Sequence, residues 1–172
     1  TKERLSQAKG EKPIRIGIGC HNQAELDMLP PILKKLSKAY TRLQPSIHVV
    51  PFKSLDYMLS DERIQVMLGF TERAGVEING VYTEICRCPI TCICSGDYHL
   101  ASHTSLTEKE LWGRALLIER HTCSNVVFKN QSRLVTNNTG VSLYYCESYE
   151  TAVAHVKSGA GFMLFPQLPN MH

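Results

Sequence analysis

The chain has 172 residues, of which 43% are hydrophobic and 20% are charged, and its formal net charge is +3 at pH 7. This composition is typical of a globular protein that buries a core, either as one domain or as two small lobes. No stretch approaches the roughly 18 consecutive apolar residues of a membrane span, and the net charge is too small to indicate a nucleic-acid surface, so both classes are excluded.

The start of the chain and its seven cysteines indicate a cytoplasmic protein. Residues 1–12 lack the apolar segment of a signal peptide and have the composition of the end of a linker helix. An odd number of cysteines without an export signal predicts free thiols in a reducing compartment rather than a disulfide framework. We therefore expect a cytoplasmic protein without a membrane anchor.

The first strand and helix organise the rest of the chain. Residues 14–18 alternate isoleucine with arginine and glycine, and this period of two predicts a strand. Apolar residues at three- and four-residue steps then predict a helix that begins between residues 26 and 29 and ends near Leu43, before Pro45. Asn22 and Glu25 have the spacing of a capping box at its start. Because ligands of open α/β sheets lie at the carboxyl ends of strands, we expect the functional site at residues 20–23.

The same pattern continues as far as a hinge. A second strand is predicted at residues 47–52, a helix at 54–60 with Ser54 as its cap, and a third strand at 64–69. Two successive right-handed crossovers imply a parallel sheet, so residues 13–70 are expected to form the first lobe. The pattern then breaks, and we place a hinge near residues 70–75.

A second lobe with the same α/β pattern is expected at residues 71–166. The sequence predicts extended segments and helices in alternation, at residues 81–87, 90–95, 107–112, 115–118, 124–130, 141–146, 148–158 and 162–165. Ser148 is the expected cap of the last helix and Gly159 its terminal glycine. Four aromatic residues of these strands are expected in the core, namely Tyr144, Tyr145, Phe162 and Phe165. Residues 167–172 are expected to be a truncated return to the first lobe.

Several motifs together resemble one protein family in their order and spacing. They are Arg15-Ile16-Gly17-Ile18, Leu29-Pro30-Pro31-Ile32-Leu33, the stretch from Glu62 to Val66, Tyr98-His99-Leu100-Ala101, and the helix–glycine–strand from Val156 to Pro166. Over residues 14–166 the chain resembles the effector-binding (substrate-binding) domain of a LysR-type transcriptional regulator. The resemblance implies a two-lobed, periplasmic-binding-protein-like α/β fold of type 2, with mostly parallel sheets flanked by helices. It also implies a ligand-sensing domain that is not an enzyme and that lacks the family's N-terminal winged helix-turn-helix domain.

The resemblance further implies that a small effector binds between the lobes. Carried over to this sequence, the effector-binding positions are Cys20, His21, Asn22, Phe52, Lys53, Thr71, His121, Thr122 and Ser148. A helix start and nearby basic side chains favour an anionic effector, a carboxylate. Simpler interpretations stay open, in which Asn22 and Ser148 only cap helices and His21 is a surface residue.

Four cysteines lie close together in sequence, at positions 86, 88, 92 and 94. A single strand would place Cys86, Cys88, Cys92 and Cys94 on one face, with the outermost pair roughly 20 Å or more apart. One metal ion could hold all four only if the chain bends sharply at Pro89. We favour buried structural thiols, with a zinc site or redox sensing as the alternatives, and we expect no metal and no cofactor.

Two other functions compete with the sensor interpretation. A solute-binding protein of a transporter would share the fold, but the missing signal peptide and the unpaired cysteines argue against it. A Cys/His hydrolase would need Cys20 and His121 within hydrogen-bond reach. For a sensor, the resemblance implies a homodimer formed through the first helix, a homotetramer of the full-length protein, and DNA contact only through the missing domain.

Overall fold

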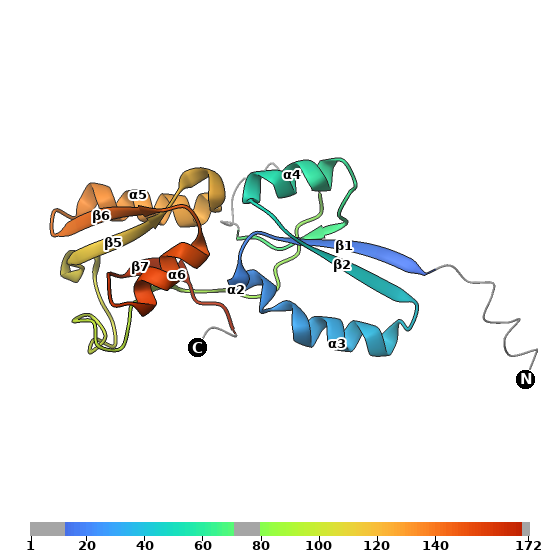
Figure 1. The fold of residues 1–172 in the computed structure, drawn as a ribbon, viewed down its shortest axis with the longest axis horizontal. Helices are drawn as coiled ribbons and strands as arrows, with labels where there is room; N and C mark the ends of the chain where they lie inside the picture. Colours follow the sequence, from blue (N-terminus) through green and yellow to red (C-terminus); the bar gives the residue numbers. More distant parts are fainter. Residues whose placement is uncertain (1–12, 71–79, 170–172) are drawn as a thin grey trace, which may run out of the picture.

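The computed structural model describes residues 13–70 and 80–169, which form two lobes side by side (Figure 1). The first lobe consists of β1 (Ile14–Cys20), α2 (Gln23–Leu26), α3 (Leu29–Ala39), β2 (Leu43–Val49), α4 (Phe52–Ser60) and β3 (Val66–Met67). Its three strands are parallel in the order β2-β1-β3, as the predicted crossovers require.

Helices cover both faces of this first sheet (Figure 1). On the α3 face, Leu29 packs with Ile18 and Cys20 of β1. On the α4 face, Leu55 and Met58 pack with Ile64, the residue that leads into β3. The two small cores hold β1 between them, and they fix the position of its carboxyl end.

The predicted boundary between the first helix and the second strand is wrong. The helix α3 ends at Ala39, since Tyr40 leaves the helical region with φ −131° and ψ 84°. The strand β2 begins at Leu43 and includes Pro45, which pairs in register with Ile16. Proline has no N–H to donate to a ladder, but β2 is an edge strand, where that loss is tolerated.

The second helix of the first lobe also begins earlier than the sequence predicts. The helix α4 starts at Phe52 directly after Pro51, and no side chain caps it, so Ser54 is not its cap. Phe52 and Lys53 therefore lie in the first turn of a helix rather than at the end of a strand.

The second lobe contains strands from distant parts of the sequence. Its elements are β4 (Ile90–Ile93), η1 (Glu108–Glu110), β5 (Gly113–Ile118), η2 (Arg120–Thr122), α5 (Asn125–Asn137), β6 (Val141–Cys146), α6 (Tyr149–Lys157) and β7 (Met163–Pro166). The strands β5 and β6 are parallel, whereas β4 and β7 are antiparallel. A bridge between Ala115 and Phe162 joins the two pairs.

The helices α5 and α6 pack on opposite faces of β5. Leu134 of α5 contacts the cluster that contains Ala115 and Leu117, whereas Val156 of α6 contacts the cluster with Leu116 and Ile118. Alternate residues of one strand thus serve two cores, as the pleat of a strand requires.

Several predictions for the second lobe are confirmed. The bounds of β6 and the Ser148 cap of α6 are as predicted, and Gly159 has φ +72°, the left-handed conformation of a terminal glycine. Phe162 and Phe165 are buried. The prediction is wrong for Tyr144 and Tyr145, which are exposed because β6 has no neighbour on its outer side within the described residues.

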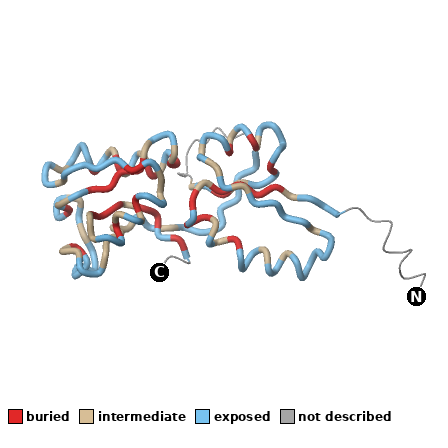
Figure 2. The backbone as a smooth tube through the Cα atoms, in the orientation of Figure 1, coloured by how far each residue is buried: buried red, intermediate tan, exposed pale blue. Residues whose placement is uncertain are grey.

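The two lobes are in direct contact where α2 meets the second lobe. Ala24 of α2 belongs to the same buried cluster as Ile118 and Val156 of the second lobe. Phe70, at the end of the first lobe, contacts Phe165 edge-on with ring centroids 5.7 Å apart. Figure 2 shows buried residues along the strands of both lobes and at the point where the lobes meet. This contact positions the candidate site.

Candidate functional site

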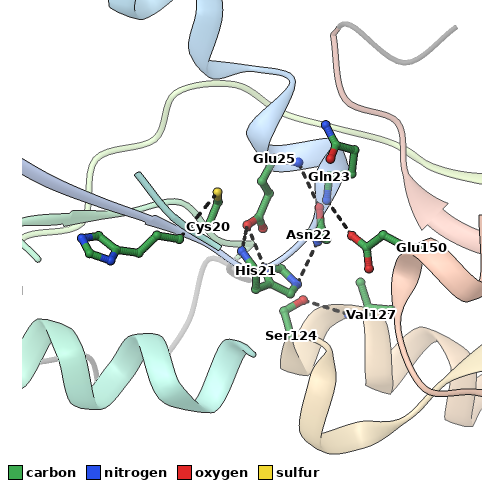
Figure 3. Close-up of polar contacts among 9 residues, drawn as sticks. Cys20, His21, Asn22, Gln23, Glu25, Ser124, Val127 and Glu150 are labelled. Atoms are coloured by element: carbon green, nitrogen blue, oxygen red, sulfur yellow. Dashed lines mark hydrogen bonds and ion pairs between the residues drawn. The ribbon is translucent and has the colours of Figure 1, made fainter. Parts of the chain in front are cut away.

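The carboxyl end of β1 and the short helix α2 lie at the boundary between the lobes (Figure 3). Asn22 is the N-cap of α2, and its Oδ1 accepts a hydrogen bond from the Glu25 N–H at 2.9 Å. The predicted cap is therefore confirmed. The Glu25 side chain does not return to the cap residue, however, because its Oε2 accepts from the N–H of His21 at 2.9 Å.

His21, Asn22 and Glu25 form a buried polar network. The side chains of His21 and Glu25 are each 2% exposed, and the His21 Nδ1 lies 2.8 Å from Glu25 Oε2. Because Asn22 Oδ1 accepts from a backbone N–H, its Nδ2 donates to His21 Nε2, 3.0 Å away. The imidazole therefore carries its proton on Nδ1, and this N–H donates a hydrogen bond to Glu25 Oε2.

One oxygen of this network has no partner. Glu25 Oε1 is buried, and within the described residues nothing donates a hydrogen bond to it. A buried carboxylate oxygen without a donor is costly, since it has lost its hydration and gained nothing in return. Glu25 therefore carries an unsatisfied acceptor oxygen at the lobe boundary, which is closed to solvent in this arrangement of the lobes.

Cys20 precedes this network and is completely buried. Its Sγ lies 3.9 Å from the His48 carbonyl oxygen. Burial, and to a smaller extent the negative charge of Glu25, raises the pKa of the Cys20 thiol to about 11. The thiol is therefore protonated at neutral pH and is a poor nucleophile.

The second lobe faces the site through η2 and the start of α5. Thr122 donates to the Glu119 carbonyl at 2.9 Å, and the exposed His121 ring lies 3.2 Å from the Glu119 carboxylate. The helix α4 packs against η2 across the boundary. On the first-lobe side, the ring of Phe52 lies edge-on to the ring of His21, with centroids 5.3 Å apart.

A hydrogen bond joins the lobes directly. The backbone N–H of Gln23 donates to Glu150 Oε1 at 2.8 Å (Figure 3). Glu150 stands in the first turn of α6, one residue after the first residue of the helix that Ser148 caps. Ser148 is held by its capping box with Thr151, and it bonds within its own helix.

The structure thus brings together most, but not all, of the predicted positions. His21, between Cys20 and Asn22 in the turn after β1, lies against Phe52, and α4, which carries Phe52, packs against η2, which carries His121 and Thr122. Lys53 is exposed on the first turn of α4, and Thr71 lies outside the described residues.

Sequence reasoning missed two residues of this region, Glu25 and Glu150. The spacing of Glu25 from Asn22 predicts only a cap. Its contact with His21 has no helical signal, because His21 precedes the N-cap and lies outside α2. Glu150 carries no signal beyond that of an acid in the first turn of a helix, where it complements the helix dipole.

The four clustered cysteines are not the buried structural thiols that the sequence predicts. Cys86 is exposed, and Cys88, Cys92 and Cys94 are partly buried, whereas the fully buried thiols lie elsewhere, at Cys20, Cys123 and Cys146. All seven are free thiols. In the described part of the chain, no group of three or more His, Cys, Asp or Glu side chains is placed to hold a metal ion.

A cavity of about 770 Å³ opens on the second lobe, on the α5 side of β4. Its apolar lining includes Cys92, Cys94 and Leu164, and Arg133 lies at its edge. Arg133 forms an ion pair with Glu108 at 2.6 Å. Of the eight predicted effector-binding residues that the structure describes, none lines this cavity.

Across residues 13–70 and 80–169, no helix has the length and apolar character needed to cross a bilayer.

Comparisons with known proteins agree with the geometry. Among solved structures, HinK, a LysR family transcriptional regulator from Pseudomonas aeruginosa, is similar with a TM-score of 0.69 at 16% identity, over 99% of this chain and 58% of HinK. The CcmR regulatory domain from Synechocystis PCC6803, in complex with 2-PG, has a TM-score of 0.67 at 14% identity, over 92% of this chain and 76% of that domain. The effector binding domain of QuiR in complex with shikimate has a TM-score of 0.66 at 11% identity, over 92% and 76%.

These structures establish the fold, and the sequence match establishes the family. The chain spans less than two thirds of the HinK regulator. A search of curated proteins finds no match. The family model described as the LysR substrate binding domain, however, matches residues 9–169, which is nearly the whole chain. The predicted two-lobed, periplasmic-binding-protein-like fold is confirmed, and the chain belongs to the LysR substrate-binding domain family.

Proposed function

We propose that this domain senses a small-molecule effector bound between its lobes, and that it controls the DNA-binding domain of a LysR-type regulator. The observation that carries the proposal is the buried network of His21, Asn22 and Glu25 at the lobe boundary, with Glu25 Oε1 left without a donor. An effector that binds one lobe arrangement better than another shifts the population towards it. The proposed effector-binding positions are Cys20, His21, Asn22, Phe52, Lys53, Thr71, His121, Thr122 and Ser148.

The chemistry of the boundary supports an anionic effector that also carries a hydrogen-bond donor. Lys53, Arg120 and His121 are exposed on α4 and η2, which contact each other; Lys53 and Arg120 supply positive charge for a carboxylate or phosphate, and His121 supplies a ring nitrogen for hydrogen bonding. Glu25 Oε1 supplies an acceptor for a hydroxyl. QuiR was solved with shikimate and CcmR with 2-PG, which makes these two compounds suitable first probes.

The same features support a regulatory domain rather than an enzyme. A Cys/His hydrolase needs an activated thiol, but burial raises the pKa of the Cys20 thiol to about 11. Free thiols at all seven cysteines suit the reducing cytoplasm, where the regulator would meet DNA through its helix-turn-helix domain.

We also propose that the domain forms a homodimer through α3 and the edge strand β2, as part of a homotetrameric regulator. Ile32 of α3 and Ile47 and Val49 of β2 are exposed, and Tyr40 between these elements is 61% exposed. Exposed apolar side chains beside an open strand edge favour association with a second copy. Sedimentation of Ile47→Glu should show a smaller species than the unchanged protein, while Val135→Glu, on the exposed side of α5, should leave the mass unchanged.

The sensor proposal is tested by a thermal-shift titration with shikimate, 2-PG and a panel of hydroxylated carboxylates. A ligand at 100 times its dissociation constant stabilises the folded domain by about 2.7 kcal/mol. The double variant Lys53→Ala/Thr122→Ala should lose this stabilisation, because both positions flank the lobe boundary. Lys109→Ala, an exposed lysine on η1 in the second lobe, is the matched control and should retain it.

The outcomes separate the site from the function. If the ligand still stabilises Lys53→Ala/Thr122→Ala, the proposed site is contradicted, whereas the proposal that the domain binds an effector stands. No stabilisation by any member of the panel, in a domain that unfolds cooperatively, would contradict the anionic effector.

A further inference from the structure

The cluster of four cysteines is divided by the fold into two separate pairs. Cys88 packs against the core cluster on the α6 side of the second lobe, together with Ile93. Cys92 and Cys94 pack against the cluster on the other side of the sheet, and they line the 770 Å³ cavity. The strand β4 runs between the two clusters, so one ion cannot hold all four thiols.

Cys86 and Cys88 form the accessible pair. Their Sγ atoms lie 3.6 Å apart, Cys86 is exposed and Cys88 is partly buried. Across the described residues no third His, Cys, Asp or Glu completes a metal-binding group with them. A structural zinc site needs four ligands, so this pair does not suit zinc. Two thiolates whose sulfurs are this close suit a soft cation of filled d shell and low coordination number, because thiolate ligands select ions such as Cu(I).

From this geometry we infer that Cys86 and Cys88 form a two-thiolate binding site for a soft monovalent cation of the Cu(I) class. Each thiol gives up one proton, and each sulfur forms one bond to the cation, so the two thiolates and the cation carry a net charge of −1. Arg87, between the two cysteines, forms an ion pair with Glu84, in which its Nε donates to the Glu84 carboxylate at 2.8 Å. No change of oxidation state is needed.

The position of this pair gives the site a means to affect the lobes. Cys88 packs against a cluster that contains Ala24 of the first lobe as well as residues of the second. The next residue, Pro89, accepts a hydrogen bond from the Gln167 N–H at 2.9 Å. A cation bound to both Cys86 and Cys88 therefore restrains a segment held at the contact between the lobes. This inference is independent of the effector proposed above.

The test is an anaerobic titration of the reduced 172-residue chain with Cu(I), in competition with the chromophoric chelator bathocuproine disulfonate. The unchanged chain should withdraw one equivalent of Cu(I) from the chelator, and the sulfur-to-copper charge-transfer absorption should rise to the same end point. Cys86→Ser and Cys88→Ser should each abolish this equivalent. The double variant Cys92→Ser/Cys94→Ser is the matched control, and it should retain the equivalent and the absorption.

Three results would overturn the assignment. They are withdrawal of no copper by the unchanged chain, retention of the tight equivalent in Cys86→Ser/Cys88→Ser, and its loss in the Cys92→Ser/Cys94→Ser control with circular dichroism unchanged. A Cys86–Cys88 disulfide that forms with hydrogen peroxide in a chain that takes up no Cu(I) would likewise replace the metal site with a redox pair. Cys86 is exposed and unconnected to the core, so Cys86→Ser is expected to fold.

Discussion

Glu25 accepts two hydrogen bonds from His21 while both side chains are almost fully buried, so removal of its carboxylate leaves two buried donors without an acceptor. We expect Glu25→Ala to lower the free energy of unfolding by about 2 to 3 kcal/mol. Urea denaturation measures the change. Gln23→Ala is the control, since among the described residues its exposed side chain bonds Asp27 alone, and it should cost less than about 0.5 kcal/mol. Equal losses in the two variants would show that the network is not a source of stability.

Cys20 makes stability depend on pH in the alkaline range. Well below pH 9, the ordinary pKa of a thiol, Cys20 keeps its proton in both the folded and the unfolded chain. Its ionisation then takes nothing from the free energy of unfolding. As the pH rises from 9 towards 11, the unfolded chain loses the proton first, so unfolding becomes easier. A shift of the Cys20 pKa from 9.0 to about 11 lowers the free energy of unfolding by about 2 to 3 kcal/mol once the pH exceeds both values. Cys20→Ala should make the fall in stability between pH 8 and 11 less steep in urea titrations, although not abolish it, because burial also raises the pKa of Cys88 and Cys123. An unchanged slope would contradict the assignment.

The polar residues of the site were predictable only as far as their local roles. Asn22 and Ser148 follow from cap patterns that involve neighbours three residues away, and both caps are present. Glu25 bonds the backbone N–H and the ring of His21 rather than the cap residue, and both side chains are buried in the assembled fold, a property that leaves no local pattern. Sequence alone therefore located the turn but not the acid that organises it.

The strand β1 contains two glycines that other segments approach closely. Gly17 faces Arg63 and Ile64, and Gly19 faces the side chains of Leu55 and Ile64. A Cβ on Gly17 would lie 2.9 Å from both Arg63 O and Ile64 Cα, which are backbone atoms that cannot move aside cheaply. We expect Gly17→Ala to destabilise the domain by about 1 to 3 kcal/mol through overpacking. Gly96→Ala is the control, since no atom lies within 4 Å of its added Cβ. Thermal denaturation with similar midpoints for both variants would contradict the packing argument.

For the helices and strands, the sequence predicted the type of each element better than the residues at which it begins and ends. The alternation of residues 14–18 predicts the strand β1, because that pattern is local, and the strand predicted at residues 141–146 has the bounds of β6. The end of α3 and the start of β2 were misplaced, since Pro45 normally argues against a strand and only the edge position of β2 admits it. The exposure of Tyr144 and Tyr145 depends likewise on β6 being an edge, a property of the assembled sheet.

The arrangement of the two lobes rests on contacts that one substitution can weaken. Glu150→Ala removes the acceptor of the Gln23 N–H, and the lobes should separate more often. For a contribution of about 1 kcal/mol, hydrogen exchange at the Gln23 amide should accelerate roughly fivefold. Glu147→Ala, a substitution of an exposed acid close to the same helix, is the control. Two-dimensional NMR follows the exchange, and an unaltered rate in Glu150→Ala would show that this bond does not hold the lobes together.

In the hydrogen bond between Gln23 and Glu150, the first lobe contributes a main-chain N–H and the second lobe contributes a side-chain carboxylate. Every amino acid except proline carries that N–H, so variation at position 23 cannot abolish the donor while the backbone keeps its course. The acceptor, by contrast, is lost with most replacements at position 150. Substitutions that change how readily the two lobes separate should therefore be found on α6 rather than in the turn after β1. The residue at position 150 alone decides whether this hydrogen bond has an acceptor.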